Sequence, residues 1–224
     1  MTVDEKKVMR RYQTIIGCLG WALPVLSVGF GLIGYFRGVN EPGWYESISA
    51  TYYANSSMMM VGLLFAISLY FWAYKGYDRV DNFITKISAI AAMGIVAFPC
   101  ADGQATSAEI VGLFCLPTAL SGKIHTILAV VLYVTFFIQI QRFKKGKKHM
   151  TEQKKKRNRV YNWCMFLMLI GFAIIILSIV DKTLLPYHFL VLVGECFLQV
   201  GFGTAWLVKS ESIKALNDDA PQED

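Results

Sequence analysis

The ionisable side chains that stand among apolar residues are the ones that could do chemistry in this chain. Three polar residues, His188, Glu195 and Gln199, occur at spacings of seven and four in the run Y-H-F-L-V-L-V-G-E-C-F-L-Q. These spacings place them on one face of a helix. An ionised carboxylate facing lipid costs roughly 3 kcal/mol. We therefore expect Glu195 to point into the protein and to form the floor of a pocket.

Further polar side chains occur near the ends of other apolar runs. His125 begins one apolar run, and Asp102 follows another. The segment E-S-I-S-A-T-Y-Y adds a group of hydroxyl side chains, namely Ser47, Ser49, Tyr52 and Tyr53. We predict that His125 and His188 form the rim of the pocket, and that the hydroxyl groups contact a ligand from a lid over the pocket.

The same residue types also permit a metal site. Two histidines and two carboxylates are ligand types that zinc prefers. His188 and Glu195 are about 10 Å apart along a helix axis and cannot readily share one ion. His125, His188 and Asp102 remain as possible zinc ligands. A serine nucleophile has less support, because no serine of E-S-I-S-A-T-Y-Y lies in a G-x-S-x-G elbow. Ligand binding without a cofactor is the main interpretation, and a zinc-dependent hydrolase is the alternative.

Six apolar runs position these residues. They cover residues 12–36, 56–74, 83–100, 124–141, 160–180 and 187–208. At 1.5 Å per residue, each run is about long enough to cross a hydrocarbon core of ~30 Å. The sequence therefore predicts an all-α polytopic membrane protein with six transmembrane helices.

The positions of the basic residues predict the orientation. Of 22 Lys and Arg residues, all but Arg37, Lys123 and Lys182 fall at the N-terminus, in the second and fourth loops or in the tail. By the positive-inside rule both termini are cytoplasmic, in what we expect to be a bacterial inner membrane. Ten basic residues between Arg142 and Arg159 suit anionic inner-leaflet headgroups, so no nucleic-acid partner is expected.

The composition leaves no room for a separate soluble domain. The chain is 55% hydrophobic and 17% charged, so we predict one membrane domain over residues 1–209. The polar residues 210–224 are predicted to be a disordered cytoplasmic tail. Cys100 and Cys115 border the outward third loop, where a disulfide could persist.

Helix packing and a lid complete the predicted pocket. Small residues recur on one face of both the first and sixth runs, which favours close packing of these two helices. In the third loop, I-V-G-L-F-C-L-P-T is too short to span and is predicted to cover the outer face. An amphipathic pocket beneath it would suit a lipid or another small amphiphile. A structural or partner-binding subunit is a second alternative, and a homo-oligomer is compatible with the sequence.

Several motifs carry a resemblance to known families. They include S-I-S-A-T-Y-Y (47–53), Y-K-G-Y-D-R-V-D-N (74–82), I-H at residue 125 and K-K-R-N-R-V-Y (155–161). Together they resemble six-span bacterial membrane proteins and, more distantly, the family of DRAM, Sfk and FGF-receptor-activating proteins. The resemblance implies six spans and no particular activity, and it draws attention to Ser47, Ser49, Asp81, Asn82 and His125.

A weaker resemblance is to the superfamily of alkaline ceramidases and adiponectin-type receptors. The proteins of that superfamily are membrane hydrolases that use a Ser, an Asp and three His around zinc. This chain departs from the pattern, because Ser49 is followed four residues later by Tyr53, where a histidine would be expected. The resemblance supports the hydrolase alternative.

Overall fold

Six α-helices make up most of the chain. The computed structural model describes residues 3–40, 45–101, 109–144, 151–180 and 189–218. The helices are α1 (Val3–Phe36), α2 (Ser57–Ala73), α3 (Arg79–Ala97), α4 (Thr118–Phe143), α5 (Glu152–Val180) and α6 (Leu190–Lys209). All except α2 are long and apolar enough to cross a membrane, and α2 is an apolar helix of 17 residues. The prediction of a multi-pass helical membrane protein is confirmed.

Four short elements connect or follow these helices. They are the 3-10 helices η1 (Ser49–Tyr53) and η2 (Lys214–Leu216) and an antiparallel hairpin of β1 (Ile110–Val111) and β2 (Leu116–Pro117). The hairpin is a small departure from the all-α prediction. In addition, α4 begins at Thr118, so Lys123 is helical and not in a loop as expected.

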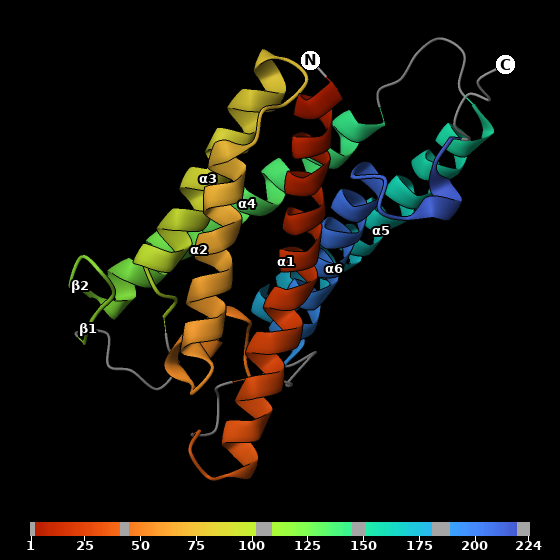
Figure 1. The fold of residues 1–224 in the computed structure, drawn as a ribbon. Helices are drawn as coiled ribbons and strands as arrows, with labels where there is room; N and C mark the ends of the chain where they lie inside the picture. The colour runs from red at the N-terminus through yellow and green to blue at the C-terminus, as the bar shows by residue number, and fades with distance from the viewer. Residues whose placement is uncertain (1–2, 41–44, 102–108, 145–150, 181–188, 219–224) are drawn as a thin grey trace, which may run out of the picture.

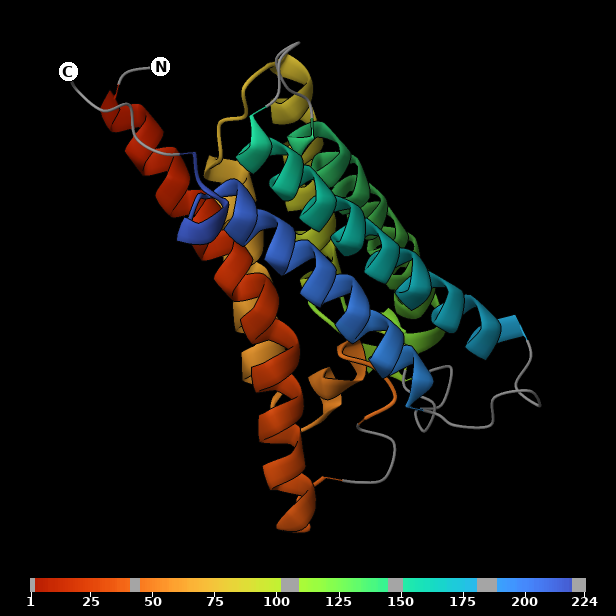
Figure 2. The same cartoon turned by 90° about the vertical axis from the view of Figure 1, so that its right-hand side faces the viewer.

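The bundle has two ends with different contents (Figure 1). The start of α1, the α2–α3 turn and the residues after α6 lie together at one end, which we call the basic end. The opposite end holds η1, the β1–β2 hairpin and the start of α6, and we call it the hairpin end. Between the ends, α5 and α6 run side by side, and α1 crosses α6 (Figure 2).

Glycines allow α6 to approach two neighbours closely. A Cβ on Gly17 would lie 2.9 Å from the Gly203 carbonyl oxygen, so α1 and α6 are in backbone contact there. This confirms the predicted pairing of the first and last helices. Gly194 serves a different contact, because its Cβ would lie 2.7 Å from the Gly171 carbonyl oxygen of α5. Such approach supplies the van der Waals attraction that joins helices in lipid.

Aromatic rings fill the core toward the basic end. Phe136 of α4 stacks on Phe202 of α6 at 3.7 Å between ring centroids. Phe71 of α2 and Trp206 of α6 pack edge to face at 5.6 Å. All four side chains are buried. The cluster therefore ties α2, α4 and α6 together.

The α2–α3 turn is stabilised by its own polar groups. The Asp78 carboxylate caps α3 by accepting from the Asp81 backbone N–H at 2.8 Å. The Arg142 guanidinium donates to both Asp78 and Asp81, and the Asn82 side chain accepts from the Gly76 N–H at 2.7 Å. The cap bond and then Arg142 lower the pKa of Asp78. Asp81 and Asn82, to which the family resemblance drew attention, thus have structural roles here.

Residues 210–218, the first part of the predicted disordered tail, make contacts with α1 and α5. Arg157 of α5 donates to the Leu216 carbonyl oxygen at 2.7 Å and pairs with Asp218 at 2.8 Å. Glu211 pairs with Arg10 of α1 at 2.7 Å. These bonds hold the tail across the basic end, because its acids meet arginines of α1 and α5. Residues 219–224 lie outside the described residues.

Candidate functional site

The η1 segment is fixed at the hairpin end by bonds to α6. The Glu195 carboxylate accepts from the Ile48 backbone N–H at 2.5 Å, and it also bonds the Ser49 backbone N–H. The Leu192 N–H donates to the Glu46 carbonyl oxygen at 3.1 Å. Glu195 therefore does point into the protein, as its cost in lipid requires, and it holds the loop that carries Ser49.

Ser49 and His125 are hydrogen-bonded to each other. The Ser49 Oγ lies 3.0 Å from His125 Nε2, and His125 Nδ1 lies 2.8 Å from the Phe98 carbonyl oxygen. A carbonyl oxygen can only accept, so we assign the imidazole proton to Nδ1. The Ser49 hydroxyl then donates to Nε2. His125 is 4% exposed, whereas Ser49 is partly exposed.

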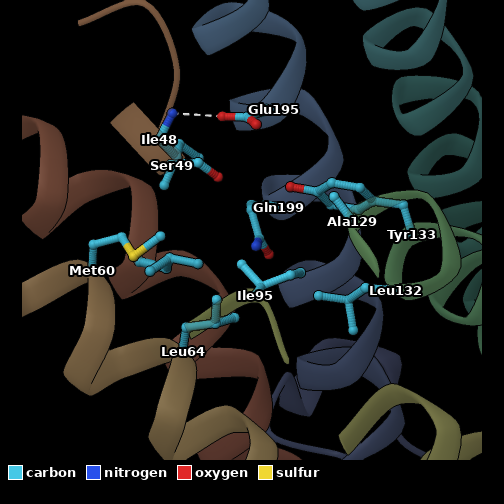
Figure 3. A pocket seen from close by; sticks show the side chains of 11 residues that line it. Ile48, Ser49, Met60, Leu64, Ile95, Ala129, Leu132, Tyr133, Glu195 and Gln199 are labelled. Atoms are coloured by element: carbon cyan, nitrogen blue, oxygen red, sulfur yellow. Dashed lines mark hydrogen bonds between the residues drawn. The ribbon is translucent and has the colours of Figure 1, made fainter. Parts of the chain in front are cut away.

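Four polar side chains surround a cavity of about 20 Å³ beside Ser49. They are Ser49 of η1, Tyr133 of α4, and Glu195 and Gln199 of α6. In Figure 3 the Ser49 and Tyr133 hydroxyl groups face each other, whereas the Gln199 amide points toward Ile95. Gln199 is 2% exposed, and its Oε1 has no hydrogen-bond partner among the described residues. A space of this size holds about one water molecule. Glu195, which was predicted to form the floor of a pocket for an amphiphile, thus lines a cavity with room for a water-sized group.

A much larger apolar groove, of about 980 Å³, runs between α2 and α3. Its long walls are apolar, and Tyr52 of η1 with Phe98 and the hairpin closes one end. The principal wall residues are Val61, Phe65, Leu69, Trp72, Ile90, Met93 and Ala97. From Val61 to Trp72 the groove is about 16 Å long at 1.5 Å per residue. That length matches one leaflet of a hydrocarbon core of ~30 Å.

The hairpin covers the Tyr52 end of the groove, in the region where a lid was predicted. Phe114 at its turn stacks on Phe98 with ring centroids 4.9 Å apart. Gly112 has a φ of +73° and lies against Pro99, so the turn needs a glycine there. Cys100 and Cys115, the candidate disulfide pair, have free thiols in the structure.

The other predicted site residues fall in different places. Ser47 accepts from the Ala50 N–H at 2.8 Å, which stabilises the start of η1. The Tyr53 hydroxyl donates to the Cys100 carbonyl oxygen at 2.8 Å. His188 and Asp102 lie outside the described residues. Within the described ranges no group of three His, Cys, Asp or Glu side chains is placed to hold a metal ion, and both nitrogens of His125 have protein partners.

Two site groups were not predicted from the sequence. Tyr133 lies eight residues after His125 on α4, or about two helical turns, and this spacing could have placed it on the same face. The Phe98 carbonyl oxygen, which orients His125, has no sequence signal of its own.

Comparisons with protein families, curated proteins and solved structures give no match for this chain.

Proposed function

We propose that this protein binds a membrane lipid, with one acyl chain in the groove between α2 and α3 and the head group at the hairpin end. In this proposal α2 is a sixth span, both termini are cytoplasmic, and the protein belongs to a bacterial inner membrane. The observation that carries the proposal is the apolar groove of about 980 Å³, whose length matches one leaflet.

The polar groups at the two ends of the groove support this orientation of the lipid. Tyr52 contributes a hydroxyl side chain to the hairpin end. At the other end, the Lys86 ammonium group lies 4.9 Å from the centroid of the Trp72 ring and donates to the Trp72 carbonyl oxygen. Because Lys86 is engaged within the protein, the hairpin end is the better place for a head group.

Native mass spectrometry tests the proposal. The full chain is extracted from its bilayer in mild detergent, and mass above the 25.2 kDa chain is recorded. We expect one lipid-sized adduct on the wild type and its loss in Met93→Trp, which fills the groove. Ile127→Trp is the matched control, because Ile127 is 64% exposed on α4 and outside the groove. A bare wild-type chain, or an adduct that Met93→Trp retains, would contradict the proposal.

A further inference from the structure

We propose that Ser49 and His125 are a nucleophile and its general base, and that they cleave the acyl ester of a lipid. The choice of a lipid ester as substrate rests on the proposed function. The assignment of the pair itself rests on the geometry of the hairpin end.

The arrangement meets the geometric requirements of nucleophilic catalysis. An activated serine needs a base within about 2.6–3.2 Å and a third group that orients the base. Ser49 Oγ and His125 Nε2 are 3.0 Å apart, and the Phe98 carbonyl oxygen holds Nδ1 at 2.8 Å. The two side chains come from η1 and α4, 76 residues apart in sequence. The fold therefore brings together a pair that no local motif encodes.

Donors for a developing oxyanion line the same cavity as Ser49. Tyr133 and Gln199 both line this cavity, and in Figure 3 the Tyr133 hydroxyl points toward Ser49. Side chains of these types stabilise the negative charge of a tetrahedral intermediate when they are fixed in advance. Glu195 acts as a positioning residue, since it binds the backbone N–H groups of Ile48 and Ser49.

The groove for the acyl chain and the Ser49–His125 pair are connected through η1 and Phe98. Tyr52 lines the groove and belongs to the same 3-10 helix as Ser49. Phe98 lines the groove with its ring and orients His125 with its carbonyl oxygen. Ser49 itself lines the separate small cavity, so in this proposal the ester of a lipid whose chain fills the groove passes η1 at Tyr52 to reach Ser49.

The reaction follows the usual two steps of acyl transfer. Ser49 Oγ attacks the ester carbonyl carbon while its proton passes to His125 Nε2. The tetrahedral intermediate collapses, the alcohol leaves with the proton from Nε2, and an acyl ester of Ser49 remains. Water then attacks this ester, giving its proton to His125, which returns one to Ser49 Oγ. The products are the carboxylic acid and the alcohol.

A fluorophosphonate probe tests the pair whichever lipid is the substrate. The full chain in lipid nanodiscs is treated with the probe, and the modified residue is identified by peptide mass spectrometry. We expect labelling of Ser49, none at that position in Ser49→Ala, and a labelling rate at least about 100-fold lower in His125→Gln. Ser47→Ala removes a hydrogen bond of η1 but no histidine partner, so its rate should stay within about threefold of wild type.

Two results would overturn the assignment. One is a wild-type chain on which Ser49 stays unlabelled, and the other is a His125→Gln rate equal to that of wild type in protein whose thermal unfolding is unchanged. If His125→Gln does not fold, Gln199→Leu replaces it, with an expected rate at least about tenfold lower. The labelling of Ser49 and the native mass of the lipid adduct are recorded on the same wild-type preparation. Failure of lipid binding and failure of the nucleophile are thus separate outcomes.

Discussion

The two ends of the bundle use their polar residues in opposite ways. At the basic end Arg142 bonds Asp78 and Asp81, and Arg157 pairs with Asp218, so much of the charge is neutralised inside the fold. The hairpin end has few charges, yet it contains the Ser49–His125 pair and a buried Gln199 oxygen without a partner among the described residues. Buried polar atoms without a described partner also occur toward the basic end, at Gln139 and Asn217 for example. The hairpin end therefore differs in having a Ser–His pair and few charges, whereas the polar groups of the basic end mainly hold helices and tail together.

The largest effect on stability is expected at the basic end. Arg142→Met leaves two carboxylates without their cation, and the Arg142 side chain is only 13% exposed. Breaking a fully buried pair costs about 3–5 kcal/mol, and partial exposure reduces this to roughly 2 kcal/mol. Unfolding in mild detergent measures the loss, and the labelling of Ser49 should be unchanged. Arg159→Met, at an exposed arginine of the same basic region, should change stability by less than about 0.5 kcal/mol. Equal losses in both variants would contradict this role of Arg142.

An intermediate effect is expected for two substitutions in the cavity at the hairpin end. Glu195→Leu leaves the Ile48 and Ser49 N–H groups without their acceptor, at a cost of about 1–2 kcal/mol. Gln199→Leu removes an unsatisfied polar atom and should leave stability unchanged or slightly increased. Both should slow the labelling of Ser49. If Gln199→Leu destabilised the protein as much as Glu195→Leu does, the Gln199 oxygen would have a structural partner, and its role at the hairpin end would be structural.

The smallest effect concerns acid sensitivity at the basic end. The pKa of Asp78 is lowered by the Asp81 N–H bond and then by Arg142, so the unfolded chain binds this proton more tightly than the folded one. The stabilisation is complete above the ordinary pKa of an aspartate and is lost as the pH falls through the lower folded value. Asp78→Asn should have a shallower dependence of stability on pH between about 5 and 3. Identical slopes for wild type and variant would show that Asp78 does not contribute.

The fold was largely predictable from the sequence, because lipid imposes one solution on apolar runs. The contact of α1 with α6 followed from small residues, although Gly194 proved to contact α5. The inward direction of Glu195 followed from the cost of a charge in lipid. The hydrogen bond from the Ile48 N–H to the Glu195 carboxylate could not be predicted, since that bond depends on how η1 folds.

The pairing within the candidate site depends on long-range structure. Ser49 and His125 were both predicted as site residues, but 76 positions separate them and no local pattern relates them. The groove was not predicted, because its walls are ordinary apolar residues of α2 and α3 whose meaning depends on the space between the helices. The contact of the tail with α5 was not predicted either, since it depends on Arg157 meeting Asp218 across the basic end.

Crosslinking with a phospholipid that carries a photoreactive group midway along one acyl chain tests the central claim most directly. The full chain is irradiated in nanodiscs that contain this lipid, and the crosslinked residues are mapped by mass spectrometry. We expect crosslinks to concentrate on groove residues such as Phe65, Leu69 and Met93, and Met93→Trp to disperse them. Equal crosslinking of the exposed residues Ile127 and Ile176, which lie outside the groove, would show an ordinary lipid annulus and would contradict a lipid site between α2 and α3.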